Sequence, residues 1–354
     1  MKLKTIISWL ALVLIVGAFV GYISKNIEGF RQLSLASPYL ITLIALLHVL
    51  FLVNNGLMLK LFMIPFRINL IGKEWFGLSA ITSFGNYFIP GIGGATSRAV
   101  YLKKRYEFPY SRFLGNLAGN YIMVFLTNSF VALVALILAK ALFGFWNWIL
   151  FLIFLLIFLV ALFFVLFHIR PFKAKWLQKA NMVIEGWEYV RRSGRLVAGT
   201  ILIGLMNIIV FSLLLFLEFR VFGFEIGILP VLIVALTSML SIFINVTPAG
   251  LGIKEGLVVL TSTVFGIPPE IAVSVALIDR VVNLIVVFVL GPIFSYVLLK
   301  GNSKSPHTSA IAESRPSTRT LHSPNKIVEL PLKKQKEGDK IVKSPSPKVG
   351  GKKK

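Results

Sequence analysis

Cysteine is absent from this sequence, and there are only four histidines, at positions 48, 168, 307 and 322. Without cysteine the chain can form no disulfide and can offer no thiolate to a substrate or a metal. The histidines are too scattered in the sequence to suggest a metal cluster, so we expect no metal and no other cofactor. The sequence also shows no paired acid and nucleophile of the kind an enzyme would need, so we do not expect an enzyme.

Charged side chains are scarce as well. They make up 14% of the 354 residues, hydrophobic residues make up 56%, and the mean hydropathy is +0.84. Soluble domains average about 25% charged and about 45–50% apolar residues. This composition predicts an all-α polytopic membrane protein, in which long apolar helices cross the bilayer.

Acidic residues are the rarer of the two charge types, with 14 Asp and Glu against 37 Lys and Arg, a net charge of +23. Residues 301–354 carry 13 basic and 4 acidic residues, or +9, which leaves +14 for the rest. Much of that +14 lies in short loops, which indicates membrane topology and contact with anionic lipid headgroups rather than nucleic acid. The segment 301–354 is rich in Ser, Pro and Lys and is predicted to be a disordered, basic, cytoplasmic tail.

Apolar runs predict six full spans and two interrupted segments within residues 1–300. The first run, 5–23, has 19 uncharged residues, about 28 Å of helix, and follows Lys2 and Lys4. It lacks a good cleavage site, so we interpret it as a permanent span rather than a signal peptide. The other predicted spans are 39–59, 113–139, 145–167, 196–217 and 271–299. The charges from Glu218 to Glu225 predict a loop after residue 217.

Polar residues occur within two of these spans. His48, Asn54 and Asn55 in the second span are expected to bond to neighbouring helices rather than to bind a ligand. Asn116, Asn120 and Asn128 are spaced by four and eight residues, which places them on one helix face. Such a polar stripe should face protein or a cavity instead of lipid.

Backbone-breaking residues interrupt the two remaining apolar segments, 74–107 and 226–266. These structural breaks are Pro90, Gly91 and Gly94 in the first, and Pro248, Gly250 and Gly252 in the second. Because unpaired backbone groups cost several kcal/mol in hydrocarbon, each segment is predicted to be a re-entrant hairpin of two half-helices shielded by protein.

The two interrupted segments resemble each other. A shift of 158 residues lays Pro90 on Pro248 and Gly94 on Gly252. The basic loops 101–112 and 168–195 should be cytoplasmic, together with both termini, which orients the two hairpins oppositely. The predicted fold is therefore a helical bundle with two inverted repeats, as in many secondary transporters.

Charged residues gather at the breaks. Lys254 and Glu255 follow the second break directly, and Asp279 and Arg280 occupy the next helix. A helix beginning near Gly252 would aim free N–H groups at an anion. The candidate substrate-binding residues are Arg98, Lys254, Glu255, Asp279, Arg280, Asn283 and Asn120.

In this hypothesis the basic members of that set bind a phosphate, and the acidic members hold them when the site is empty. Two alternatives stay open. The charges could form a structural ion-pair network that locks the hairpins together. Asp279 and Asn283, four residues apart, could instead coordinate a proton or Na⁺.

The motif Pro248-Ala-Gly-Leu-Gly-Ile-Lys-Glu255, followed by Ala276-Leu-Ile-Asp-Arg280 and Gly291, is typical of a known family. Together with the run from Pro90 to Leu102, it makes residues 5–300 resemble the membrane region of lysylphosphatidylglycerol synthases and related flippase-like proteins. The resemblance implies a bundle with inverted repeats that moves a polar-headed lipid between leaflets. Glu255 and Arg280 match its second motif, and Arg98 matches the first.

Two departures from that family pattern matter. Asn120 and Tyr121 stand where the first repeat often has an acidic residue followed by arginine. Only 54 polar residues follow position 300, where the synthases carry a soluble aminoacyl-transferase domain, so the synthase reaction is not implied.

These observations predict a transporter in the cell membrane whose substrate is a phospholipid, a glycolipid or a lipid-linked glycan. A secondary transporter of a small solute or ion is one alternative. A non-catalytic membrane scaffold for a lipid-modifying partner is another. The sequence indicates neither the oligomeric state nor the energy source.

Overall fold

The computed structural model describes residues 39–88, 93–167, 193–244 and 250–301, and isolated positions 21, 24, 181, 184, 187, 188, 191 and 247. All regular elements in this part of the chain are helical, so the all-α prediction is confirmed there. The chain divides into two units, Met1–Ser305 and Pro306–Lys354, and the labelled helices belong to the first. The predicted span 5–23, the residues Pro90, Gly91 and Pro248, and the tail after residue 301 lie outside the described residues.

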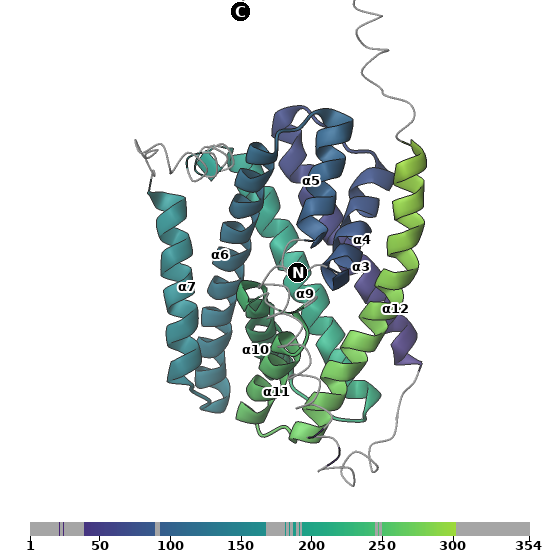
Figure 1. Cartoon of the computed structure of the whole chain (residues 1–354). Helices are drawn as coiled ribbons and strands as arrows, with labels where there is room; N and C mark the ends of the chain where they lie inside the picture. The colour runs from purple at the N-terminus through teal and green to yellow at the C-terminus, as the bar shows by residue number, and fades with distance from the viewer. Residues whose placement is uncertain are drawn as a thin grey trace, which may run out of the picture. The chain divides into compact units, whose positions relative to one another are not determined.

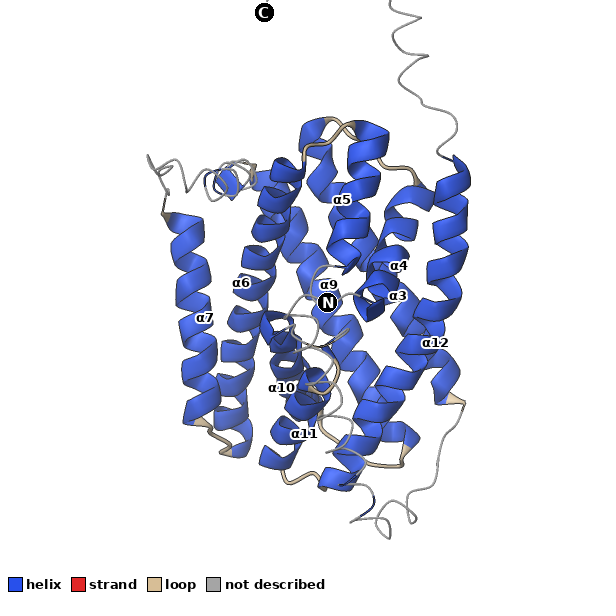
Figure 2. Ribbon diagram, in the orientation of Figure 1, coloured by secondary structure: helices blue, strands red, loops and turns tan. Residues whose placement is uncertain are grey.

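The helices run mostly along one direction and pack side by side (Figures 1 and 2). In chain order they are α3 (Leu40–Met63), η1 (Ile64–Phe66), α4 (Gly72–Phe88), α5 (Gly93–Tyr106), α6 (Tyr110–Phe143), α7 (Trp148–Leu166), α9 (Gly194–Val221), α10 (Ile228–Met239), η3 (Leu240–Ile244), α11 (Ile253–Val264) and α12 (Pro269–Gly301). Five of them, α3, α6, α7, α9 and α12, are long and apolar enough to cross a membrane. The described part is therefore that of a multi-pass membrane protein.

Helix α9 corrects one sequence prediction. It continues to Val221, so Glu218 and Arg220 are helical instead of belonging to a loop after residue 217. Glu218 is fully buried. A single charge does not interrupt backbone hydrogen bonding, so a helix continues through it wherever the surrounding protein shields the side chain from lipid.

Helix ends are closed by local hydrogen bonds, because a free backbone group is costly at membrane depth. The Asn147 side chain accepts a hydrogen bond from the Leu150 N–H at 3.0 Å and starts α7. Gly144 ends α6 with a φ of 66°, and its N–H bonds back to Ala139 and Lys140. Left-handed φ values of this kind favour glycine.

The central helices bury one another, whereas α7 faces outward. Helix α3 packs on α9, α4 packs on α12, and α6 lies between α7 and α9. Only 11% of the most apolar window of α7 is buried, against 50% for α6. Since α7 is also the most hydrophobic of the five, it presents lipid-facing surface and carries no part of the site described below.

The two interrupted segments form the short helix pairs α4–α5 and α10–α11. In Figure 1, α4 and α5 lie in the upper half of the bundle, and α10 and α11 lie in the lower half. Placement at opposite ends is what inverted repeats predict, although the repeat relationship itself stays a prediction.

A buried carboxylate ties the outer ends of α4 and α5 together. Glu74 accepts hydrogen bonds from the Tyr101 hydroxyl at 2.8 Å and from the Tyr106 hydroxyl at 2.6 Å. Its second oxygen also accepts the Ile71 N–H at 3.1 Å. These bonds hold the pair closed where it meets the loop to α6.

At the inner ends of the pair, Gly94 allows α5 to approach α4 closely. Its N–H donates to the Asn86 Oδ1 at 3.0 Å. A Cβ on Gly94 would overlap the backbone oxygen of Thr82 and lie 2.6 Å from the Asn86 Oδ1. Small residues at such crossings are the usual basis of tight helix packing in membranes.

We therefore expect Gly94→Ala to destabilise the protein by about 1–3 kcal/mol, because the added methyl group meets backbone that cannot move aside. The measurement is the thermal unfolding midpoint of the purified protein in detergent. Gly256→Ala is the matched control, since a Cβ there would meet nothing within 4 Å and the residue lies inside α11. A Gly94→Ala protein that unfolds at or above the parent's midpoint would contradict the close approach.

Candidate functional site

Polar side chains line a cavity of about 340 Å³ between the central helices. It is formed by α3, α4, α6, α9, α10, η3, α11 and α12. Its polar lining consists of His48, Asn55, Ser83, Asn86, Tyr87, Asn120, Tyr121, Asn128, Asn207, Ser238, Ser241, Lys254, Arg280 and Asn283. An interior with so many amides and hydroxyls can hold water or a polar group inside an apolar bundle.

The first turn of α11 organises the charged side of this cavity. Gly252, at φ 82°, precedes the helix, and its N–H donates to the Glu255 Oε2 at 2.8 Å. The Glu255 Oε1 accepts from the Arg280 Nε at 2.7 Å. The helix N-terminus that the sequence offered to a substrate anion thus already binds the protein's own carboxylate, so Glu255 holds Arg280 in position.

Arg280 reaches from α12 toward α4. Its Nη1 lies 3.5 Å from the Tyr87 hydroxyl, and the Asn283 Nδ2 donates to the same hydroxyl at 3.1 Å. The Arg280 guanidinium carbon lies 5.8 Å from the centre of the Tyr87 ring. Tyr87 on α4 therefore contacts Arg280 on α12, which Glu255 on α11 holds in turn. These contacts connect the two predicted hairpin regions.

Lys254 makes the second charged contact between α11 and α12. Its Nζ donates to the Asp279 Oδ2 at 2.6 Å and lies 4.5 Å from the centre of the Phe211 ring. Both Lys254 and Arg280 line the cavity, whereas Glu255 and Asp279 lie behind them. The acids neutralise cations that face the cavity, which is the pairing expected of an empty anion site.

Arg98 corrects the expectation of one shared chamber. It lines a separate cavity of about 50 Å³, where its Nε donates to the Thr82 hydroxyl at 3.2 Å. The reason is that α5 and α11 lie in opposite halves of the bundle (Figure 1). Asn55 and Asn120 line both cavities and form the boundary between them.

The asparagine stripe on α6 faces protein and cavity, as its spacing predicted. Asn116 is buried and donates to the Phe62 carbonyl at 3.2 Å. Asn128 lines the large cavity and donates to the Met239 sulfur at 3.3 Å. Of the other predicted break residues, Gly250 lines the cavity at φ 68°.

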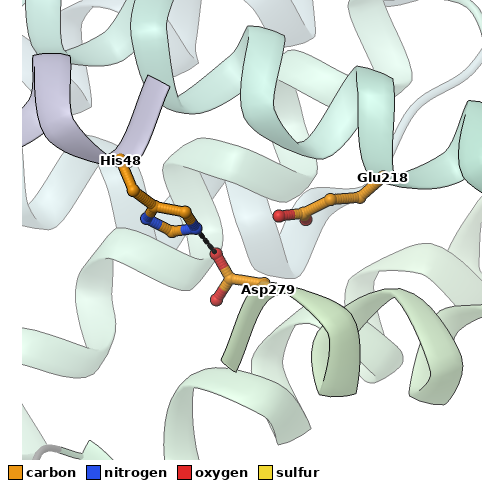
Figure 3. Close-up of side chains that lie close together, drawn as sticks. All are labelled: His48, Glu218 and Asp279. Atoms are coloured by element: carbon orange, nitrogen blue, oxygen red, sulfur yellow. Dashed lines mark ion pairs between the residues drawn. The ribbon is translucent and has the colours of Figure 1, made fainter. Parts of the chain in front are cut away.

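Sequence reasoning missed one ionisable residue beside Asp279, and it did not identify the partner of a second. His48 contacts a neighbouring helix, as expected: its Nε2 lies 3.6 Å from the Asp279 Oδ1 on α12. Glu218 was placed in a loop, yet one oxygen or nitrogen from each of His48, Glu218 and Asp279 lies within 4.8 Å of the others (Figure 3). The available signal was an acid within an otherwise apolar run, which marks a functional site by default.

The fold and cavity define a class: a multi-pass helical membrane protein with a charged polar site enclosed by its helices. A family model described as the lysylphosphatidylglycerol synthase TM region matches residues 6–291. The match covers most of the chain, so the chain belongs to this family.

Two curated relatives are archaeal proteins named UPF0104 membrane proteins. One, from Methanocaldococcus jannaschii, is 31% identical over 114 residues, which are 32% of this chain and 32% of the relative. The other, from Methanothermobacter thermautotrophicus, is 34% identical over 94 residues, 27% of this chain and 28% of the relative. The aligned part thus spans about a third of the length of each relative, whose names state only that they are membrane proteins.

The contacts of Lys254 predict a large stability effect. Lys254→Met leaves Asp279 and Glu218 buried together without a cation, and breaking such a buried pair costs about 3–5 kcal/mol. The double variant Lys254→Met/Asp279→Asn should recover much of that loss, because it removes the stranded charge. Thermal unfolding of the purified variants in detergent measures both effects.

The matched control breaks an exposed ion pair. Arg220 and Glu225 are paired at 2.8 Å, with side-chain exposures of 41% and 81%. Arg220→Met should therefore cost no more than about 1 kcal/mol. A double variant no more stable than Lys254→Met alone would show that Lys254 and Asp279 do not depend on each other.

Proposed function

We propose that this protein moves a lipid with an anionic head group between the two leaflets of a membrane. The observation that carries the proposal is the polar cavity, with Lys254 and Arg280 on its wall. Charges inside a bilayer are expensive and mark substrate or ion pathways by default. The description of the family, which names a lipid-modifying enzyme, supports a role with lipids.

The cations suit a phosphate group. Each is held by a carboxylate at 2.6–2.7 Å, so neither is left uncompensated while the cavity is empty. An arriving phosphate can take over part of these charge-assisted bonds. Asn120, Asn283 and Tyr87 add neutral donors and acceptors for the remaining oxygens of a head group.

The size of the cavity favours a small head group. Its volume of about 340 Å³ lies near the lower end of the roughly 300–1,000 Å³ that small-molecule sites span. This room suits a phosphate with a short polar substituent, whereas a lipid-linked glycan of several sugars would need a wider conformation. The acyl tails would have to stay outside, in the hydrocarbon.

We infer that the tails leave the cavity beside Ile242. Ile242 lines the cavity and is 40% exposed. It ends the apolar helical stretch Ile228–Ile242. An apolar side chain that is exposed beside the cavity supports an opening toward lipid.

The alternatives use the same residues differently. A small anionic solute could bind the same cations and fit entirely inside the cavity, which keeps a solute transporter as the second candidate. A scaffold for a lipid-modifying partner would need no enclosed charges. We further place the protein in the cell membrane with both termini in the cytoplasm, because the basic loops 101–112 and 168–195 favour that side.

The test is leaflet transfer of a fluorescent anionic phospholipid in proteoliposomes that contain the full chain. Arg280→Ala and Glu255→Gln are expected to reduce the initial rate at least tenfold. The first variant removes the Arg280 cation from the cavity wall, and the second breaks the ion pair that holds Arg280 in position. Arg220→Ala is the matched control, since it removes an exposed arginine outside the cavity. Circular dichroism and gel filtration confirm that the variants are folded.

Two further arms separate the candidates. A zwitterionic phospholipid should move more slowly than the anionic one, and uptake of the free phosphoglycerol head group should not exceed leakage. Uptake of the free head group without lipid transfer would instead identify a solute transporter. Equal rates for the parent and both cavity variants would refute the site.

A further inference from the structure

Glu218 is a buried carboxylate on α9, in the interior of the bundle. It is 0% exposed, and neither of its carboxylate oxygens accepts a hydrogen bond from the described residues. The Nε2 of His48 and the Oδ1 of Asp279 are likewise buried without a hydrogen bond there. These unsatisfied atoms come from α9, α3 and α12 and converge on one point (Figure 3). Buried polar atoms normally have partners, so acidic and imidazole groups that converge in this way need a shared proton or cation.

The local charge count indicates a single positive charge. Asp279 is neutralised by Lys254 at 2.6 Å, which leaves the negative charge of Glu218 without a partner. An isolated carboxylate and a second carboxylate beside it are both strongly disfavoured in an apolar interior. One monovalent cation restores neutrality, whereas a divalent metal next to Lys254 would leave an excess positive charge.

Among monovalent cations, a proton fits the donor set. Imidazole and carboxylate groups exchange protons readily, and hard metal cations prefer a larger set of oxygen ligands. We propose that Glu218, Asp279 and His48 form a proton-binding site that couples transport to a proton gradient. At rest the proton is carried by Glu218, since Asp279 has Lys254 as its counter-charge.

The surroundings of Glu218 define what controls this proton. Asp279 on α12 lies beside it, and Lys254 on α11 pairs with Asp279. His48 faces the cluster from α3, and α10 contributes no ionisable residue over Ile228–Met239. The ionisable residues of α6 are Tyr110, Arg112, Tyr121 and Lys140, and of these four only Tyr121 lines the cavity together with His48.

His48 supplies the route to water. It lines the large cavity, whereas Glu218 and Asp279 do not. A proton from cavity water can therefore reach the Asp279 Oδ1, 3.6 Å away, through the imidazole, and can pass from Asp279 to Glu218 in the same cluster. An imidazole accepts a proton on one nitrogen and releases it from the other, so it relays protons without a net change.

Coupling to substrate follows from Lys254, and this step rests on the proposed function. When a head-group phosphate draws Lys254 away from Asp279, Asp279 loses its counter-charge and must bind a proton of its own, in addition to the proton on Glu218. Anion binding therefore raises proton affinity, and by linkage proton binding raises anion affinity to the same degree. The result would be lipid transport driven by the proton gradient.

The first experiment tests the proton site alone. Infrared difference spectroscopy of the purified full chain should show the C=O band of a buried protonated carboxylic acid, shifted in D₂O. Glu218→Gln should lose this band while Glu225→Gln, which changes an exposed acid, retains it. Because glutamine mimics the neutral acid, Glu218→Gln should remain folded. A band that survives in Glu218→Gln would overturn the assignment of the proton to Glu218.

The second experiment tests coupling in proteoliposomes. A gradient of one pH unit coupled to one proton can support up to about a tenfold ratio of labelled lipid between leaflets. The parent and Glu225→Gln should respond to the gradient, whereas Glu218→Gln should equilibrate the lipid to equal amounts. Replacing Na⁺ with choline at fixed pH should change nothing.

The outcomes separate the two proposals. Dependence on Na⁺ instead of pH would overturn the proton assignment while leaving lipid transfer intact. A parent that transfers lipid without responding to the gradient would overturn coupling. A Glu218-dependent infrared band without any lipid transfer would refute the proposed function and the coupling that rests on it, but would retain the proton site.

Discussion

The structure depends on two ion pairs that cross between α11 and α12. Lys254 pairs with Asp279 and Glu255 with Arg280, so adjacent residues on one helix bind adjacent residues on the other. In hydrocarbon a charge must be neutralised or hydrated, and these contacts neutralise four charges beside one cavity. They also fix where the cavity wall is cationic, because the acids lie behind and the basic groups face inward.

The two predicted hairpins carry this chemistry unequally. At the 158-residue shift that aligns their breaks, Thr96 and Ser97 correspond to Lys254 and Glu255. A one-residue gap after the breaks then lays Asn120 and Tyr121 on Asp279 and Arg280. The first half therefore offers hydroxyls and an amide where the second half offers two ion pairs. Its own cation, Arg98, lies in the smaller cavity beyond Asn55 and Asn120. Whatever the ancestry of the two halves, the charged site belongs to one of them.

Much of the fold could be predicted because hydropathy reports helices directly. The long apolar helices and the polar stripe on α6 follow from composition and spacing. The predicted end of α9 was wrong. The charges after residue 217 were interpreted as a helix boundary, whereas the burial of Glu218 by surrounding helices allows α9 to continue. Pairings could not be predicted either: His48 and Asp279 meet through three-dimensional packing, and no local pattern connects residues so distant in sequence. The separation of Arg98 from the other cations is likewise a property of the assembled bundle.

The two hydrogen bonds that Glu255 accepts have a consequence for how the helices can move. Its carboxylate binds the Gly252 N–H at the start of α11 and Arg280 on α12 at the same time. Together with the neighbouring Lys254–Asp279 pair, these contacts hold the start of α11 against α12, so we expect the two helices to move together in any rearrangement. We expect such a movement to bend the chain before α11, where α10 is followed by the 3₁₀ turn η3, the kind of irregular backbone that often serves as a hinge.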